Sequence, residues 1–249
     1  MRVSIITIAY NSEETITDTI KSVLAQDYDQ IEYIVIDGAS RDKTMSIVRS
    51  YKDQISTIIS EPDEGIYDAM NKGVKAATGD LIGILNSDDF YVDSKVVSDI
   101  VAALTEQEAE AIYADLEYVD RTATNKVIRH WRAGEYEPNA FRKGWMPPHP
   151  TFFLSHKAYR EYGCYNTDLR SAADYELMLR MIHKHGVKLG YLPRVITKMR
   201  VGGQSNMSVK NRIKANIEDR LAWKLNGLTP GMFTLIMKPL SKIGQYLKR

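Results

Sequence analysis

Residues 3–9 read VSIITIA, a run in which Ser4 is the only residue that is neither apolar nor β-branched. Such a run is typical of a strand that is buried on both faces of a sheet. Asn11 and Ser12 follow as turn residues. Apolar residues then recur at helical spacing, at Ile16, Ile20, Val23 and Leu24. This stretch therefore predicts a strand, a polar turn and a helix, the unit from which parallel sheets are built.

The same pattern recurs along the first half of the chain. Further strands are expected at residues 31–37, 57–60 and 80–86, and the first two of these precede apolar residues at helical spacing. No Asn-Gly hairpin signal separates the strands. We therefore predict a doubly wound α/β fold with a mainly parallel sheet and helices on both faces.

The second half of the sequence has a less regular pattern. Residues 111–115 indicate a strand, and mixed aromatic and polar residues then continue to Pro148, where antiparallel strands are expected. Helical spacing returns at residues 177–182 and at Ile213, Ile217, Leu221 and Leu225. We therefore expect a less regular second region that ends in helices.

The composition excludes several classes of protein. The chain has 249 residues, of which 44% are hydrophobic and 26% charged, as is usual for a soluble enzyme. A formal net charge of +1 gives no reason to expect a nucleic-acid partner. Cys164 is the single cysteine, so an internal disulfide is excluded. We expect a cytoplasmic protein, because neither a secretory signal nor an apolar stretch of membrane-spanning length is evident.

Basic residues concentrate in the tail, residues 210–249, which holds nine Lys or Arg against Glu218 and Asp219. Near its end, apolar and basic residues fall on different helical faces, the pattern of an interfacial helix. The apolar set is Ile236, Leu240, Ile243 and Leu247, and the basic set is Lys238, Lys242 and Arg249. We expect the tail to rest on an anionic membrane surface, at the inner face of the cell membrane. The alternative is a helix packed on the preceding domain.

Carboxylates follow the predicted strands, at the edge where open α/β sheets bind ligands. Asp37 ends the second strand, and Asp88 and Asp89 follow the fourth. Adjacent carboxylates repel each other unless a cation or ribose hydroxyls lie between them. The alternative is a helix N-cap, although Asp93 or Ser94 could fill that role. Dinucleotide, P-loop and serine-hydrolase motifs are absent, so the pair predicts a site for a divalent cation and a diphosphate.

Six segments, taken in order, resemble the family 2 glycosyltransferases with the GT-A fold. These segments are residues 3–11, 37–44, 71–73, 78–80, 86–89 and 173–177. The likeness spans about residues 1–205, and the ordered set is more specific than any one motif. Residues 61–73 further resemble a subgroup of bacterial enzymes that build exopolysaccharide, capsule or lipopolysaccharide O-antigen.

The resemblance implies a nucleotide-sugar site in the first half. The floor of the nucleoside pocket would be formed by Thr7, Ala9, Tyr10 and Asn11. Asp37 would meet the base, Asp88 the ribose, and Asp89 a Mn²⁺ or Mg²⁺ ion. Many relatives have Asp where this chain has Asn86, so any contact from that position is neutral here. In the turn after Asp37, Asp42 is expected to cap the next helix.

Residues 61–73 provide candidates for the donor-sugar site. Ile66, Met70 and Val74 form the apolar stripe of an amphipathic helix. Four polar residues lie off that stripe, namely Asp63, Tyr67, Asp68 and Asn71. We predict that Asp68 and Asn71 face the donor sugar. The alternative is a polar connection followed by an ordinary surface helix.

Asp174 is the predicted catalytic base. The family usually has an acidic pair here, whose second member deprotonates the acceptor, and Ala173 replaces the first member in this chain. The alternative role for Asp174 is a helix N-cap. His149, between Pro148 and Pro150, is expected on the acceptor side or, alternatively, as a rigid-turn residue.

Together these features predict an inverting, metal-dependent glycosyltransferase. It would move a sugar from a nucleoside-diphosphate sugar, with UDP favoured over GDP, to a lipid-linked saccharide acceptor in surface polysaccharide synthesis. The catalytic domain is expected at residues 1–209, with a nucleotide-sugar half at 1–110 and an acceptor half at 111–209. The basic helical tail, residues 210–249, would follow.

Two other functions are alternatives to this one. A sugar-nucleotide nucleotidyltransferase needs a glycine-rich basic loop after the first strand. In this chain, residues 11–14 at that position are polar and acidic. An inactive assembly subunit would have no need to retain Asp88, Asp89 and Asp174.

Overall fold

The computed structural model describes residues 1–202 and 209–231. One nine-stranded sheet runs through it in the order β3-β2-β1-β4-β8-β6-β9-β5, with β7 paired to β6. The strands are β1 Val3–Ala9, β2 Ile31–Asp37, β3 Thr57–Ser60, β4 Leu81–Asn86, β5 Asp89–Tyr91, β6 Ala111–Val119, β7 Val127–Trp131, β8 Phe153–Ser155 and β9 Leu189–Arg200.

The predicted parallel sheet is confirmed for the first half of the chain. Strands β3, β2, β1 and β4 pair in parallel, and β1 lies between β2 and β4. Alternate side chains of β1 enter different cores, with Ile5 on one face and Ile6 on the other. Both are fully buried, which explains why this strand is apolar on both faces.

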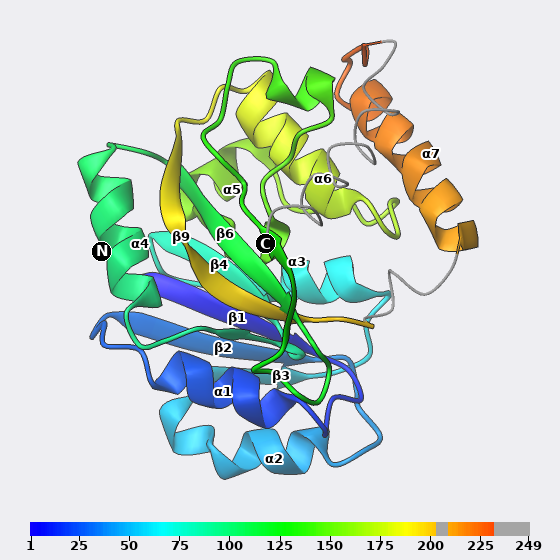
Figure 1. Cartoon of the computed structure of the whole chain (residues 1–249). Coiled ribbons are helices and arrows are strands. Elements are labelled where there is room, and N and C mark those ends of the chain that lie inside the picture. The colour runs from blue at the N-terminus through cyan, green and yellow to red at the C-terminus, as the bar shows by residue number, and fades with distance from the viewer. Residues whose placement is uncertain (203–208, 232–249) are drawn as a thin grey trace.

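Helices cover both faces of the sheet, as predicted (Figure 1). One core contains side chains of α1 Ile16–Leu24, α2 Thr44–Ser50 and α4 Val96–Glu106. The other contains side chains of α3 Ile66–Ala76, α5 His156–Tyr162, α6 Ala173–Met178 and α7 Val209–Leu225. A π-helical turn, Leu179–Lys184, continues α6.

The second half of the sheet is mostly antiparallel. Strand β8 pairs antiparallel with β4 and β6, and β7 pairs antiparallel with β6. The twelve-residue β9 runs parallel to β6 and antiparallel to β5. Strand β7 lies in the region where antiparallel strands are expected, whereas β5, β8 and β9 were not predicted. β5 and β8 have three residues each, and β9 contains Pro193 without regular alternation of exposure, so their strand character depends on pairing with neighbouring strands.

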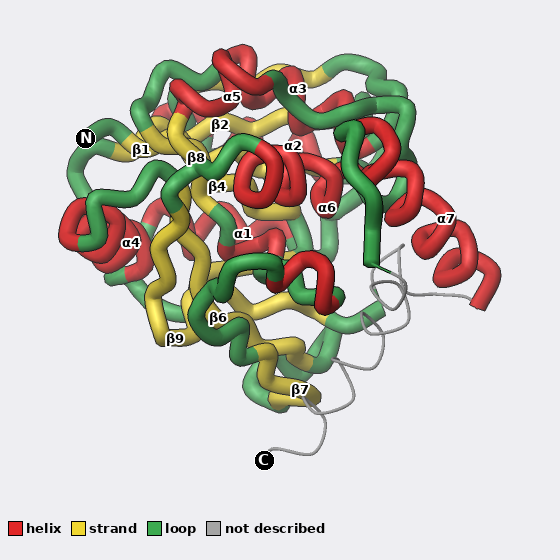
Figure 2. Tube along the Cα trace, turned by 90° about the horizontal axis from the view of Figure 1, so that it is seen from above, coloured by secondary structure: helices red, strands yellow, loops and turns green. Residues whose placement is uncertain are grey.

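Helix α7 forms as its spacing predicts, but its buried face is a different one. Ile217, Leu221 and Leu225 are exposed. Ala222 and Trp223 are fully buried instead, and the Trp223 indole donates a 2.8 Å hydrogen bond to the Tyr175 hydroxyl of α6. Figure 2 shows α7 beside α6 at one side of the molecule.

The start of the predicted tail therefore packs on the domain that precedes it. The amphipathic stretch that contains Ile236 and Leu247 lies outside the described residues. No helix in the described part of the chain combines the length and apolar character needed to cross a bilayer.

Gly73 provides a test of how α3 packs on the sheet. A Cβ atom at this position would lie 2.4 Å from Ile6 Cγ2 and 3.3 Å from Ile36 Cγ1. We expect Gly73→Ala to lower the free energy of unfolding by about 1–3 kcal/mol, because overpacking outweighs the better helix propensity of alanine. Urea unfolding would measure this, with Lys75→Ala on the exposed side of α3 as the control. Equal stability of the two variants would contradict the packing argument.

Candidate active site

The predicted site residues of the first half gather where β1, β2 and β4 end. The strands are in register, so that Ala9 lies opposite Asp37, and Ile8 opposite Asn86. Two loops, residues 10–15 and 38–43, leave this edge beside each other. The structure therefore places these motifs where doubly wound sheets bind their ligands.

Tyr10 and Asn11 form the rim of this edge. Tyr10 is 55% exposed, and Asn11 has a positive φ of 48°. The Asn11 side-chain oxygen accepts a 2.9 Å hydrogen bond from the Arg41 backbone, and its backbone N–H donates to Ser40 Oγ at 2.8 Å. Asn11 thus ties the first loop to the second and leaves the Tyr10 ring open for a ligand.

Thr7 and Ala9 lie deeper than the rim. Thr7 is fully buried, and its hydroxyl lies 3.1 Å from the Tyr33 hydroxyl. Ala9 is 1% exposed at the end of β1. Thr7 is therefore enclosed within the sheet, and Ala9 lies at the end of its strand.

Asp37 is fully buried, and its carboxylate accepts three hydrogen bonds. The donors are the Ser40 backbone at 3.1 Å, the Ser40 hydroxyl at 2.5 Å and the Ser60 hydroxyl at 2.7 Å. A base could use the remaining lone pair of Oδ1. Asp42 is not the N-cap residue of α2, which is Lys43, but it accepts a hydrogen bond from the Thr44 backbone at the start of that helix.

The turn with Asp88 and Asp89 leads into a strand and caps no helix. Asp89 begins β5, and α4 does not start until Val96. Thr19 of α1 donates a 2.7 Å hydrogen bond to the Asp89 carbonyl, and Arg200 donates a 2.8 Å bond to the Asp88 carbonyl. The N-cap alternative for this pair is therefore excluded, and neighbouring elements hold its backbone from both sides.

Asp89 and Asn86 have buried side-chain oxygens for which no hydrogen-bond donor is found in the described part of the chain. Among the described residues, the buried side-chain oxygens that lack a hydrogen-bond partner are Asn86 Oδ1 and both carboxylate oxygens of Asp89. Burial, followed by the charge of Asp88, raises the pKa of Asp89 well above its usual value, and Arg200 opposes this shift. Native proteins seldom bury oxygens in this way without a partner.

These residues fit a hard divalent cation. Oxygen atoms are the ligands that Mn²⁺ and Mg²⁺ prefer, and Mg²⁺ sites commonly use one or two carboxylates together with substrate phosphates. The described residues contain no cluster of three or more His, Cys, Asp or Glu side chains that could hold a metal alone. Asp89 would therefore hold the ion only together with oxygens of a bound diphosphate and water.

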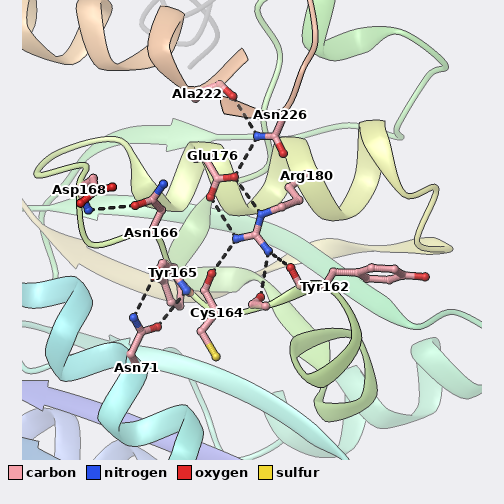
Figure 3. A network of polar contacts seen from close by, with 11 residues as sticks. Asn71, Tyr162, Cys164, Tyr165, Asn166, Asp168, Glu176, Arg180, Ala222 and Asn226 are labelled. Carbon is pink, nitrogen blue, oxygen red and sulfur yellow. Dashed lines mark hydrogen bonds and ion pairs between the residues drawn. The ribbon is translucent and has the colours of Figure 1, made fainter. Parts of the chain in front are cut away.

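The two predicted donor-sugar residues of α3 differ in their surroundings. Asp68 accepts a hydrogen bond from the Glu64 backbone, pairs with Lys72 at 3.3 Å, and keeps a side chain that is 29% exposed. Asn71 donates to the Tyr165 carbonyl and accepts from the Tyr165 backbone N–H, both at 2.9 Å (Figure 3). Asn71 thus anchors the loop after α5, and we assign it no donor-sugar contact.

Asp174 lies in the first turn of α6 and does not cap that helix. The N-cap residue is Ala172, and no side chain makes a capping hydrogen bond there. Asp174 Oδ1 accepts a 3.2 Å hydrogen bond from the Tyr67 hydroxyl, and Oδ2 lies 3.4 Å from His149 Nδ1. The Asp174 side chain is 20% exposed, so the structure brings the predicted base and the predicted acceptor-side histidine together at an accessible place.

A buried polar network fixes the helix that carries Asp174 (Figure 3). Arg180 pairs with Glu176 at 2.9 Å and donates to the carbonyl groups of residues 162–164. Asn226, just after α7, donates to Glu176 at 2.9 Å. Helix α6 is thereby fastened to α5 and to the start of the tail.

Residues 4–163 match the family described as Glycosyl transferase family 2. The chain belongs to this family. An uncharacterized glycosyltransferase of Mycobacterium tuberculosis is 33% identical over 186 residues, 72% of this chain and 68% of that protein. A PGL/p-HBAD biosynthesis glycosyltransferase of Mycobacterium bovis is 26% identical over 210 residues, covering 83% and 80% of the two chains. The Escherichia coli glucosyltransferase WfaP is 40% identical over 106 residues, 42% of each chain.

Solved structures confirm that this glycosyltransferase has the GT-A fold. A fragment of S. aureus TarS in complex with UDP-GlcNAc has a TM-score of 0.69 at 18% identity, over 91% of this chain and 65% of that one. The mannosyltransferase PcManGT of Pyrobaculum calidifontis, in complex with GDP-Man and Mn²⁺, has a TM-score of 0.68 at 21% identity. This likeness covers 99% of the present chain and 69% of PcManGT. The chain spans 42% of a longer TarS chain.

Two residues of the glycosyltransferase site escaped the sequence analysis. Arg200 was not singled out, and its contact with Asp88 spans 112 positions of the chain. Tyr67 was considered only for the donor sugar, whereas its hydroxyl meets Asp174, 107 positions away. The off-stripe position of Tyr67 was a visible signal, but it does not identify a partner, and β9, which ends at Arg200, was not predicted.

Asp89→Asn separates a ligand-binding role of the carboxylate from a structural one. We expect the metal-free variant to unfold at the same or a higher temperature than the parent, because an amide removes the cost of burying an ionisable carboxyl. Binding of UDP in the presence of Mn²⁺, measured by calorimetry, should be weakened at least tenfold. Asp53→Asn, at an exposed position, is the control for charge. A variant that melts lower and binds UDP and Mn²⁺ normally would contradict the assignment.

Proposed function

We propose that this glycosyltransferase moves a sugar from a nucleoside-diphosphate sugar to a hydroxyl of a lipid-linked saccharide, with inversion and with Mn²⁺ or Mg²⁺. The observation that carries the proposal is the set of unpartnered oxygens of Asn86 and Asp89 at the end of β4. A buried acceptor cluster at this edge suits a cation that bridges to a diphosphate. The ring of Tyr10 and the carboxylate of Asp37 lie at the neighbouring strand ends, where a nucleoside would bind.

The comparisons support a UDP-sugar over a GDP-sugar as donor. The TarS fragment was solved with UDP-GlcNAc, and WfaP is named a UDP-Glc glucosyltransferase. PcManGT, which binds GDP-Man and Mn²⁺, supports the metal and shows that the fold also accepts guanosine. We assign the ribose to Asp88, the metal to Asp89 and a donor-sugar contact to Asp68.

The reaction needs one base and one stabilised leaving group. Asp174 takes the proton of the acceptor hydroxyl, whose oxygen forms a bond to the anomeric carbon as the bond to the diphosphate breaks. A cation held by Asp89 would neutralise the charge that develops on the departing diphosphate. One displacement from the opposite face inverts the anomeric centre. His149, beside Asp174, lies where the acceptor would approach.

The acceptor proposal rests on relatives and on the position of the base. WfaP is named for an acceptor of the GlcNAc-diphosphoundecaprenol type, and the Mycobacterium bovis relative is named for PGL/p-HBAD biosynthesis. The WfaP name specifies a lipid-linked saccharide acceptor, which supports a role in bacterial surface polysaccharide synthesis. The family match and the acidic first loop both disfavour the nucleotidyltransferase alternative.

Asp174→Asn tests the base and, with it, the inactive-subunit alternative. The variant should bind UDP and Mn²⁺ as the parent does but transfer glucose from UDP-glucose to a synthetic GlcNAc-diphosphate lipid at least ~100-fold more slowly. Asp168→Asn, an exposed carboxylate of the preceding loop, is the control and should keep normal turnover. Unchanged turnover of Asp174→Asn would exclude it as the base. No transfer by the parent from UDP- or GDP-sugars would favour the inactive subunit.

We also propose that the glycosyltransferase attaches to the anionic inner face of the cell membrane through its C-terminal tail. The exposed Ile217, Leu221 and Leu225 form a stripe on α7, next to the exposed Arg220 and Lys224. Such a face suits an interfacial helix, and each basic residue near an anionic surface contributes about 1 kcal/mol. The sequence of residues 232–249 would add further apolar and basic side chains.

Vesicle co-sedimentation tests this attachment. The full chain should pellet with anionic vesicles at low salt and less at high salt, because charge drives part of the binding. A chain that ends at Thr229 should pellet less, and neutral vesicles should retain little of either protein. Equal recovery of both chains under all conditions would refute a role for residues 230–249, because both chains keep the stripe on α7.

A further inference from the structure

The side chains of Tyr67 and His149, from distant parts of the chain, meet at the Asp174 carboxylate. Tyr67 comes from the first turn of α3, Asp174 from α6, and His149 from the short helical turn His149–Thr151. That turn packs against β4, β6 and β9. The two carboxylate oxygens have different neighbours, with the Tyr67 hydroxyl at Oδ1 and the His149 imidazole at Oδ2.

The Tyr67 ring is held in place from two directions. It is 9% exposed, and it stacks on the Tyr165 ring with centroids 5.8 Å apart and an interplanar angle of 17°. Asn71, one helical turn after Tyr67, clamps the Tyr165 backbone through both groups of its amide (Figure 3). Arg180 holds the carbonyl of Cys164, the residue before Tyr165, at 2.7 Å. The hydroxyl of Tyr67 therefore has little freedom to turn away from Asp174.

Tyr67 is a permanent hydrogen-bond donor at this position. Burial, followed by the negative charge of Asp174, raises the pKa of the Tyr67 phenol, which therefore stays protonated at neutral pH. A hydrogen bond from a neutral hydroxyl to a carboxylate is short-range and directional, so it fixes the rotation of the carboxylate group.

We propose that Tyr67 is a positioning residue for the base, which holds Oδ1 of Asp174 so that Oδ2 is the atom that takes the acceptor proton. This inference rests on the proposed transfer reaction. The acceptor O–H bond breaks and an O–H bond to Oδ2 forms, while the acceptor oxygen bonds the anomeric carbon and the diphosphate leaves with the electron pair. His149 lies on the Oδ2 side, toward the acceptor. Residues 65–71 then position the base through Tyr67, in addition to any contact that Asp68 makes with the donor sugar.

Paired Tyr→Phe substitutions test the inference, because two buried tyrosines lie close to Asp174. Tyr67→Phe removes the hydroxyl at the carboxylate and keeps the stacked ring. Tyr175→Phe, on the same helix as Asp174, removes a buried hydroxyl that accepts the Trp223 hydrogen bond. Each variant loses one tyrosine hydroxyl next to α6, but only the first loses the hydrogen bond to the Asp174 carboxylate.

We expect Tyr67→Phe to lower kcat roughly 10-fold with KM for UDP-glucose unchanged, the scale of a hydrogen bond to a charged group. The acidic limb of its pH–rate profile should move to higher pH, because a carboxylate that loses a donor is protonated more readily. Tyr165 and His149 also face the carboxylate, and both are present in the parent and in the two variants. Tyr175→Phe should lower the melting temperature and leave kcat and the pH–rate profile unchanged.

The outcomes distinguish this inference from the proposed function. If the parent is active and Asp174→Asn is not, a Tyr67→Phe variant with parental kcat and pH–rate profile would overturn the positioning role alone. Equal changes in both Tyr→Phe variants would also overturn it, since they would report a general loosening of α6. If the parent transfers no sugar from any nucleotide donor, the proposed function fails and this inference fails with it.

Discussion

The Asp89 carboxylate is buried without a hydrogen-bond partner and next to the negative charge of Asp88. Ionisation of a buried carboxyl is unfavourable by several kcal/mol in proteins unless a positive charge compensates it. Thr19 and Arg200 hold the backbone on both sides by donating to the carbonyl groups of Asp89 and Asp88, and Arg200 also opposes the rise in the pKa of Asp89. If Asp89 holds a cation, as we propose, this arrangement prepares the site before its ligand arrives.

The polar groups around α6 differ from Asp89, because nearly every one of them has a hydrogen-bond partner. Glu176, Arg180 and Asn226 form a closed network that fixes α6 between α5 and α7. A fully satisfied buried network is rigid, and a rigid support suits a base that must meet an acceptor in one geometry. Asp174 itself remains partly exposed at the end of this support. The start of the tail is part of that support, because Trp223 and Asn226 bind Tyr175 and Glu176.

Helix α3 contacts both the parallel sheet and the region around Asp174. Its later part packs on β1 and β2 through Gly73, which has no room for a side chain. Its first turns carry Tyr67 and Asn71, which reach the base and the loop before it. One rigid helix thus sets the distance between the nucleotide edge and the acceptor side. This explains why a segment with an ordinary amphipathic stripe is also rich in polar side chains that the stripe does not require.

The sequence determined the parallel half of the sheet, because strands buried on both faces must be apolar throughout and the helices that cover them must carry an apolar stripe. It also determined that Asp37, Asp88 and Asp89 stand at one edge, since parallel strands end together. It did not determine β5, β8 and β9, whose strand character comes from their neighbours, or the buried face of α7, which is set by Trp223. Nor did it determine that Tyr67 and His149 flank Asp174 or that Asn71 binds backbone. These contacts join residues far apart in the chain, and only tertiary packing decides which such residues meet.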